Sequence, residues 1–288
     1  MVPLISPRRG SIMKTPAAPT LLLACLTFAP AVLGRQSGSA APPSSVQPAG
    51  NSQTLALDKQ READEILART YMATKRYREA GDLYEKLAKA HPREPSYLNL
   101  VGIAYMQGGD LRGARRWFDR AIKLAPRFAD AYNNVGATWY TEKNFKRALE
   151  YYRRAVALQP GVAGYHTNVG FAYFSLKQTA EAEEAFRRAL LMDPHIFQQN
   201  DRTGTVLQDR SVSDRGLFAF TIARSYAGTG DAERCATYLR RALDEGYRDI
   251  AKAHTDPAFA TVLADPQVQS VLALIPAPRG QAAIPPPS

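Results

Sequence analysis

Residues 132–160 read YNNVGATWYTEKNFKRALEYYRRAVALQP and hold one complete copy of a pattern that recurs along the chain. The copy closes at Pro160, and matching prolines stand 34 residues before and after it, at Pro126 and Pro194. Pro92 closes a fourth, looser copy. A fixed period of this length predicts stacked supersecondary units rather than one globular core.

Small and aromatic residues recur at fixed distances before each proline. The third unit has Gly136, Trp139, Ala148, Tyr152 and Ala155. The same positions hold Gly102, Tyr105, Ala114, Phe118 and Ala121 in the second unit, Gly170, Tyr173, Ala182, Phe186 and Ala189 in the fourth, and Ala68, Tyr71, Ala80, Tyr84 and Leu87 in the first. A glycine facing an alanine lets two helices approach closely, and the proline ends the second helix. We therefore expect two short antiparallel helices in each unit.

The stretches YLNLVGIAY, YNNVGATWY and HTNVGFAYF, each followed by Ala-x3-aromatic-x2-Ala-x4-Pro, resemble the tetratricopeptide repeat (TPR). The resemblance spans residues 61–194 and departs from the family where Leu98, Tyr132, His166 and, in the first repeat, Asp64 replace a tryptophan. It implies an all-α fold, a right-handed α-solenoid within residues 55–194 whose repeats are 61–94, 95–128, 129–162 and 163–194. It also implies a protein or peptide partner.

The period breaks after Pro194. We interpret residues 195–215 as an insertion packed over the edge of the array. A degenerate fifth helix pair follows, in which the repeat positions are held by Ala223, Tyr226, Cys235, Leu239 and Ala242. Asp231 is a predicted helix N-cap, and Gly246 is expected to end the second helix of the pair.

Two further helix starts follow the fifth pair. Asp256-Pro257 and Asp265-Pro266 each place a capping side chain before a proline in the first turn. They predict short helices at 257–264 and 266–274. Residues 216–275 would thereby cover the apolar end of the array, which repeat arrays require. Residues 276–288, which end in IPPPS, are expected to be disordered.

The N-terminal 34 residues resemble a bacterial export signal. A basic front containing Arg8, Arg9 and Lys14 precedes the mainly apolar run Leu21–Leu33, and Gly34 offers a cleavage position. The chain is therefore expected in the periplasm. Two alternatives are an uncleaved N-terminal anchor and lipidation of Cys25, because Leu22-Leu23-Ala24-Cys25 resembles a lipobox; Met13 is an alternative start. Residues 35–54 are predicted to be a flexible linker, with helix beginning near Leu55.

The motifs of common catalytic sites are absent from the sequence. It contains no GxxxxGK[ST], GxSxG or HExxH segment, and its four histidines are scattered through different units. Cys235 is the only cysteine beyond the signal and holds a small-residue position, which indicates a buried thiol. We therefore predict a chain that is not an enzyme and has no cofactor, metal or small-molecule substrate.

The resemblance implies a concave groove lined by the first helices. The residues at its groove positions are Asn99, Ile103, Met106, Asn133, Asn134, Tyr140, Asn168, Phe171 and Phe174. Amides can bond to a peptide backbone, and aromatic and Met side chains are enriched at interfaces. The alternative is that Phe171 and Phe174 pack under the insertion. The lysines with which one TPR subclass captures chaperone C-termini are missing, so a chaperone-tail adaptor is not expected.

The basic residues of the second helices suggest another function. The chain has a net charge of +10, and Arg116, Arg120, Arg153, Arg154, Arg187 and Arg188 would align into a stripe on the outer face. Such a stripe could bind membrane surfaces or polyanions. It could equally be a solvated face, since Glu150, Glu181, Glu183 and Glu184 dilute it, and export argues against nucleic acid. The favoured hypothesis is an exported scaffold that supports an envelope-associated complex.

Overall fold

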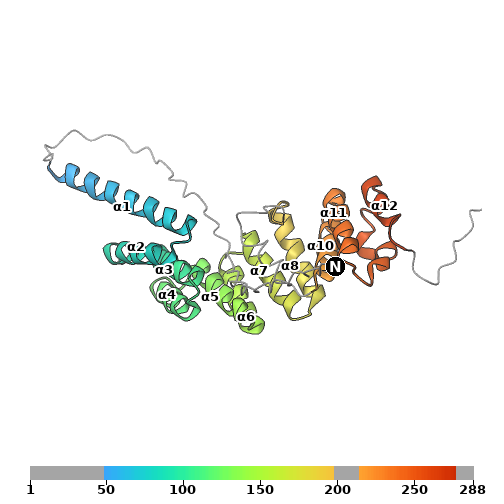
Figure 1. Cartoon of the computed structure of the whole chain (residues 1–288), viewed down its shortest axis with the longest axis horizontal. Helices are drawn as coiled ribbons and strands as arrows, with labels where there is room; N and C mark the ends of the chain where they lie inside the picture. The colour runs from blue at the N-terminus through green and yellow to red at the C-terminus, as the bar shows by residue number, and fades with distance from the viewer. Residues whose placement is uncertain (1–48, 198–213, 277–288) are drawn as a thin grey trace, which may run out of the picture.

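The computed structural model describes residues 49–197 and 214–276, and these form an all-α chain. The helices follow one another in chain order along a single arched row (Figure 1). Antiparallel pairs make up most of the row: α1 (Ala49–Ala73) with α2 (Tyr77–Ala90), α3 (Pro95–Gln107) with α4 (Leu111–Leu124), α5 (Ala129–Thr141) with α6 (Phe145–Leu158), α7 (Ala163–Ser175) with α8 (Thr179–Met192), and α10 (Arg215–Ala227) with α11 (Ala232–Asp244). The row ends in the 3-10 helices η1 (Ile250–His254) and η2 (Pro257–Phe259) and the α-helix α12 (Pro266–Leu272). The predicted array of stacked helix hairpins is confirmed.

The two helices of a hairpin meet where a glycine faces an aromatic ring. A Cβ placed on Gly136 would lie 2.7 Å from two ring carbons of Tyr152, closer than real Cβ atoms approach. Gly102 and Gly170 meet Phe118 and Phe186 in the same way. All three rings are fully buried. The sequence pattern predicts this close approach, and the structure confirms it.

Each hairpin turns through a residue in the left-handed region of backbone conformation. Gly109 and Gly230 supply this residue with φ of +91° and +78°, but the other turns use Lys75, Lys143 and Lys177 with φ between 59° and 64°. This backbone costs a residue with a Cβ on the order of 1–2 kcal/mol. The hydrogen bonds that close the turn offset that cost; in the third hairpin the Asn144 amide donates to the Trp139 carbonyl at 2.9 Å.

Aromatic rings join the fourth hairpin to the fifth. The ring of Phe218 on α10 stacks on Phe171 with 5.5 Å between centroids and meets Phe174 edge-on at 5.4 Å. Phe171 and Phe174 are 1% and 3% exposed, so the prediction that they form an open groove floor is wrong. The alternative prediction, burial under the insertion, names the wrong contact, because their ring partner lies on α10. Phe197, at the start of the insertion, packs edge-on against Phe186 at 5.4 Å.

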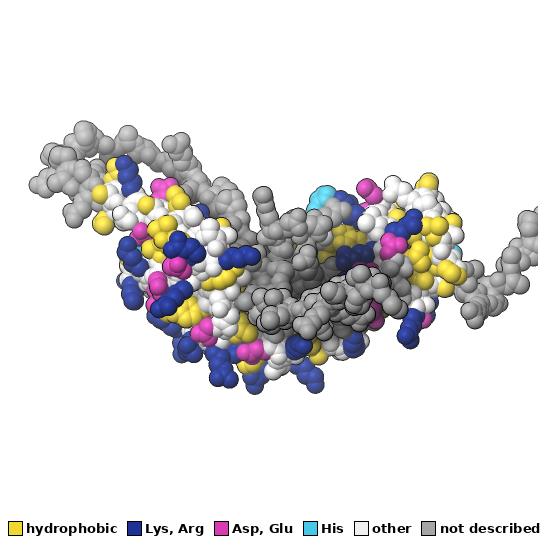
Figure 2. Space-filling model, viewed as in Figure 1, with side chains coloured by type: hydrophobic (Ala, Val, Ile, Leu, Met, Phe, Trp, Pro, Cys, Tyr) yellow, Lys and Arg dark blue, Asp and Glu magenta, His cyan; other side chains and the backbone are white. Residues whose placement is uncertain are grey.

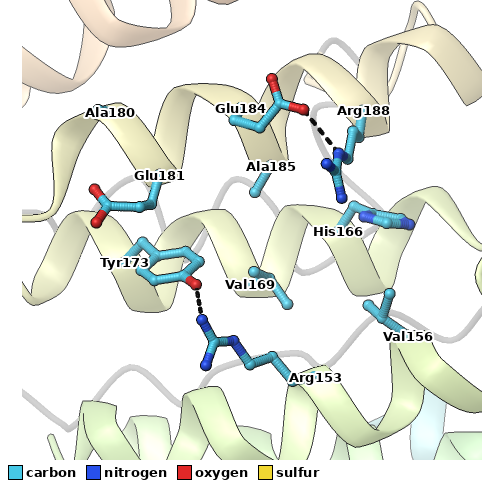
Figure 3. Close-up of a pocket in the computed structure, with 10 residues that line it drawn as sticks. All are labelled: Arg153, Val156, His166, Val169, Tyr173, Ala180, Glu181, Glu184, Ala185 and Arg188. Atoms are coloured by element: carbon cyan, nitrogen blue, oxygen red, sulfur yellow. Dashed lines mark hydrogen bonds and ion pairs between the residues drawn. The ribbon is translucent and has the colours of Figure 1, made fainter.

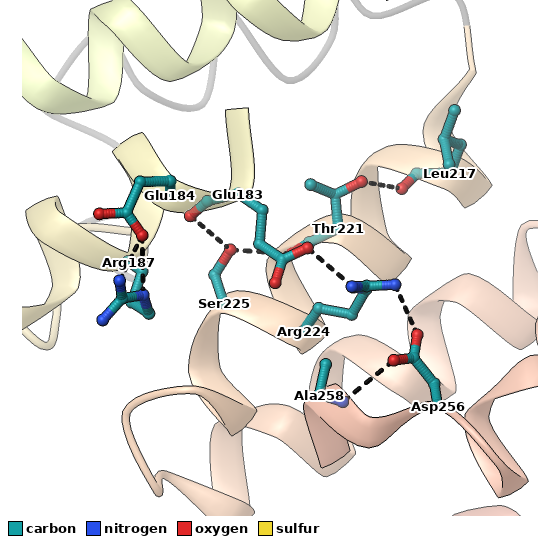
Figure 4. A network of polar contacts seen from close by, with 9 residues as sticks. All are labelled: Glu183, Glu184, Arg187, Leu217, Thr221, Arg224, Ser225, Asp256 and Ala258. Carbon is teal, nitrogen blue, oxygen red and sulfur yellow. Dashed lines mark hydrogen bonds and ion pairs between the residues drawn. The ribbon is translucent and has the colours of Figure 1, made fainter. Parts of the chain in front are cut away.

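A charge cluster fastens the C-terminal segment to the last complete repeat (Figure 4). Arg224 on α10 donates from Nε to Glu183 of α8 at 2.8 Å and from Nη1 to Asp256 at 2.5 Å. Asp256 also accepts from the Ala258 amide at 3.0 Å and so caps η2. Burial raises the pKa of the Glu183 carboxyl, although the Arg224 guanidinium beside it acts in the opposite direction. One guanidinium therefore serves carboxylates from both sides of the junction.

Most predicted helix ends in the C-terminal half are confirmed. Asp231 accepts from the Arg234 amide at 3.0 Å and Asp265 from the Gln267 amide at 2.8 Å. Gly246, with φ of +70°, follows the end of α11.

Two predicted helix bounds are wrong. The segment predicted as a helix at 257–264 is only the short η2, because buried Phe259 faces Phe220 of α10 at 5.6 Å and the Thr261 hydroxyl donates to the Ala227 carbonyl at 2.8 Å. These contacts draw successive residues toward α10. Helix α1 begins at Ala49 rather than near Leu55. Residues 54–63 are exposed, so this part of α1 depends on helix-favouring residues such as Ala, Leu, Gln and Lys rather than on packing.

Several predictions concern residues outside the described part of the chain. They are the export signal at 1–34, the Cys25 lipidation site, the linker as far as residue 48, the insertion from 198 to 213 and the tail from 277. Within residues 49–197 and 214–276, no helix is both long and apolar enough to cross a membrane.

Truncation after Pro194 should give a chain that aggregates or melts well below the full-length protein, although four repeats remain. Phe171, Phe174 and Phe186 would lose Phe218 and face water. Truncation after Pro276 should leave the melting temperature unchanged. Circular-dichroism melts of both chains make the comparison. A 1–194 chain that melts with the full-length protein would show that the C-terminal half is an independent domain.

Arg224→Gln should destabilise the fold by about 1–3 kcal/mol at neutral pH, below the loss for a fully buried pair because Arg224 is partly exposed. Glu183 and Asp256 would then face each other without a cation. Because the folded-state pKa of Glu183 is raised, the folded state takes up its proton first as the pH falls. The loss should therefore shrink toward about pH 5.

Urea unfolding at the two pH values measures this effect. Arg240→Gln, at an exposed position on α11, is the matched control and should change little. Equal losses for the two variants, or a loss for Arg224→Gln that does not depend on pH, would contradict the role given to Arg224.

Candidate functional site

The predicted groove residues lie on the first helices α3, α5 and α7, and all of them are buried. None is more than 7% exposed: Asn99, Ile103, Met106, Asn133, Asn134, Tyr140, Asn168, Phe171 and Phe174. The row exists where the repeat positions place it. Its side chains are engaged with one another rather than open to water.

Four asparagines form a hydrogen-bonded row across three repeats. The Asn134 side-chain amide donates to Asn99 Oδ1 at 2.9 Å, and that of Asn168 donates to Asn133 Oδ1 at 2.8 Å. A longer contact of 3.5 Å joins Asn133 to Asn134. We call these four residues the amide row. Sequence analysis places these amides on one face, but the structure shows that they bond first to each other and so join successive first helices.

The apolar members of the predicted groove belong to the junctions between repeats. Ile103 and Met106 pack in one cluster with Phe118 and Val135. The Tyr140 hydroxyl lies 2.8 Å from Ser175 Oγ in the next repeat. The more accessible positions of this inner face are at its margins, where Ser96 is exposed and Thr141 is half-buried.

Two tyrosine–carboxylate pairs cross the same junctions. The Tyr97 hydroxyl donates to Glu65 at 2.5 Å, and the Tyr165 hydroxyl donates to Asp130. Burial, together with the neighbouring carboxylate, raises the pKa of both tyrosines well above the usual range, so both stay neutral donors. Sequence analysis missed these pairs, although Tyr97 and Tyr165 hold the same repeat position.

The outer face is basic at its centre. Figure 2 shows Lys and Arg side chains along the convex edge of the arch. The segment 111–158, which holds α4 to α6, contains eleven basic and four acidic residues. In the predicted stripe, Arg116, Arg120, Arg153, Arg154 and Arg188 are exposed and Arg187 is half-buried.

Several of these arginines lie over aromatic rings. Guanidinium-to-centroid distances are 4.1 Å and 4.6 Å for Arg115 and Arg147 over Trp139, 4.0 Å for Arg120 over Trp117, 5.3 Å for Arg153 over Tyr173 and 5.8 Å for Arg154 over Tyr132. Each such contact contributes about 0.5–1 kcal/mol at exposed sites. Arg187 and Arg188 differ, since both pair with Glu184. The predicted stripe is therefore uniform in sequence but not in its contacts.

Two cavities lie between α6 and α8 on this outer side. The first, of about 520 Å³, is lined by Arg153 and Val156 from α6, Val169 and Tyr173 from α7, and Ala185 and Arg188 from α8, among others (Figure 3). The second, of about 470 Å³, lies beside Lys146, Leu149, Glu150, Leu176 and Gln178 and shares Arg153 with the first. We call the two together the α6–α8 groove.

Reactive groups within the described ranges are engaged or buried. Cys235 is fully buried, and burial raises the pKa of its thiol to about 12, so the reactive thiolate is not formed near neutral pH. His166 Nε2 lies 2.8 Å from the Pro160 carbonyl. Across residues 49–197 and 214–276, no group of three or more His, Cys, Asp or Glu side chains is placed to hold a metal ion.

Comparison with known proteins identifies the repeats. Family models described as tetratricopeptide repeat match residues 66–127, 102–163 and 163–196. No curated protein sequence matches the chain.

Similar solved structures include MamA, which is 21% identical, covers 62% of this chain and 93% of its own, and has a TM-score of 0.43. MamA from Desulfovibrio magneticus RS-1, residue 41 to its end, is 20% identical with coverages of 64% and 94% and a TM-score of 0.44. TTC0263, a thermophilic TPR protein of Thermus thermophilus, is 17% identical with coverages of 70% and 98% and a TM-score of 0.45.

Proposed function

Because this chain is a tetratricopeptide-repeat protein over residues 66–196, and such repeats typically mediate protein–protein interactions, we propose that it is a non-catalytic scaffold that binds a protein or peptide partner. The observation that carries the proposal is the amide row on the inner face of α3, α5 and α7. The row crosses repeat junctions, so its geometry depends on the stacking that the fold provides.

The amide row has the chemistry to bind polypeptide. An asparagine side chain offers two N–H donors and an oxygen that accepts two hydrogen bonds. The Asn134 bond to Asn99 uses one donor of the first residue and one acceptor position of the second. A backbone laid along the row could use further donors and acceptors without breaking the bonds between repeats. Ser96 and Thr141 lie at the margins where such a partner would pass.

We place the scaffold in the bacterial envelope as part of the same proposal. Its support is the basic front, apolar run and cleavage position within residues 1–34. The supported complex would then be envelope-associated. Lipidation at Cys25 and an uncleaved anchor are the alternatives for how the chain is held there.

A capture experiment tests the proposal. Tagged full-length chain is crosslinked in the native host and compared with a Ser96→Arg/Thr141→Arg pair, which places two large charges at the margins of the inner face without entering the core. The pair should lose the captured partner at least about tenfold, because buried unpaired charge at an interface costs several kcal/mol. Absence of any captured protein from the wild type would contradict the scaffold function.

The matched control is Thr237→Arg/Ser270→Arg, at exposed positions on α11 and α12. It should retain the partner. An unchanged partner in the inner-face pair would show that the partner binds elsewhere. The mass of the captured chain tests export at the same time: an N-terminus after Gly34 supports cleavage, and an unprocessed N-terminus contradicts it.

A further inference from the structure

Helix α6 carries cations that have no carboxylate partner in the described part of the chain. Its exposed face holds Lys146, Arg147, Arg153 and Arg154 against the single carboxylate Glu150, and no ion pair joins any of them. On α8, by contrast, Glu184 neutralises Arg187 and Arg188. The positive charge available to a ligand is therefore concentrated on α6.

The α6–α8 groove lies directly beside these cations. Its floor is apolar, with Leu149, Val156, Val169 and Leu176 along its length. The two cavities meet at Arg153, so the groove runs past both ends of α6. A helix of 14 residues is about 21 Å long, which matches roughly six residues of extended polypeptide.

Arg153 is held in place at the middle of the groove. Its guanidinium lies over the Tyr173 ring and donates to the Tyr173 hydroxyl (Figure 3). That contact uses one of five N–H donors of the group, and the others can bind a carboxylate. A fixed guanidinium loses less conformational entropy on binding than a free one.

These features together select one kind of ligand. Successive side chains of an extended chain point to opposite sides, so alternate residues can enter the apolar floor while the others face the α6 cations. A flat membrane surface would touch the rim of a convex groove but not its floor. Nucleic acid would supply the negative charge but no aliphatic side chains for the floor.

We propose that the α6–α8 groove is a second binding site, on the outer face, for an extended peptide segment in which acidic and apolar residues alternate. The proposal deepens the protein-binding function proposed above and rests on it. It assigns Arg153 and Lys146 to the carboxylates and the floor of the groove to the apolar side chains.

Fluorescence anisotropy with a labelled peptide of alternating Asp and Leu tests the proposal on the full chain. The peptide should bind, more weakly as salt rises, and an Asn-for-Asp version should bind at least about tenfold more weakly. Lys146→Gln/Arg153→Gln should weaken binding to a similar degree. Arg240→Gln/Arg248→Gln removes the same charge from exposed positions near the C-terminal end and should bind like the wild type.

A second variant tests the floor without changing charge. Ala180→Trp places a large side chain in the first cavity and should weaken binding, while melting curves confirm that the variant is folded. Equal peptide affinity for the wild type and the α6 pair would overturn the proposal. So would tighter binding of anionic phospholipid vesicles or single-stranded DNA than of the peptide. A peptide that fails to bind while the inner-face pair still loses its captured partner would overturn this site alone.

Discussion

The contact between a first-helix glycine and a second-helix aromatic ring is the constraint on which the structure depends. At Gly136 the Tyr152 ring occupies the space of a missing Cβ, and the same contact recurs at Gly102 and Gly170. It sets how closely the two helices of a hairpin approach. Because the contact recurs every 34 residues, successive hairpins have the same shape and can stack with the same junction.

Two surfaces follow from this stacking. The inner one is built by first helices, whose amides bond across repeats. The outer one is built by second helices, which contact each other less closely and leave the α6–α8 groove between them. At the end of the row, Phe218 and Arg224 complete the last junction with one apolar and one charged contact. Both binding proposals therefore depend on the array as a whole rather than on a single repeat.

The repeats, the fifth helix pair and the caps at Asp231 and Asp265 were predictable, because each depends on residues close together in sequence. Burial of Phe171 and Phe174 was not, because it depends on Phe218 in a segment beyond the break in the period. The pattern also could not show whether neighbouring amides bond to a partner or to each other, since this depends on distances between repeats.

The left-handed lysines were missed for another reason. Glycine marks this conformation in the turn at Gly109, and Lys143 gives no such signal at the same repeat position. The stacking of arginines on rings likewise depends on side-chain rotamers rather than on residue type. The binding residues on both faces remain predictions that the capture and peptide experiments address.

The free energy of unfolding of Gly136→Ala tests the central claim most directly, with Gly161→Ala as control. At Gly136 the new methyl group would meet the Tyr152 ring at 2.7 Å and the Ala148 carbonyl oxygen at 3.2 Å, whereas at Gly161 it meets nothing within 4 Å. Alanine favours a helix over glycine by about 1 kcal/mol, so a net loss must come from the clash. We expect Gly136→Ala to lose about 1–3 kcal/mol and Gly161→Ala to lose nothing. A Gly136→Ala chain as stable as the wild type would show that the glycine–aromatic contact does not determine the hairpin.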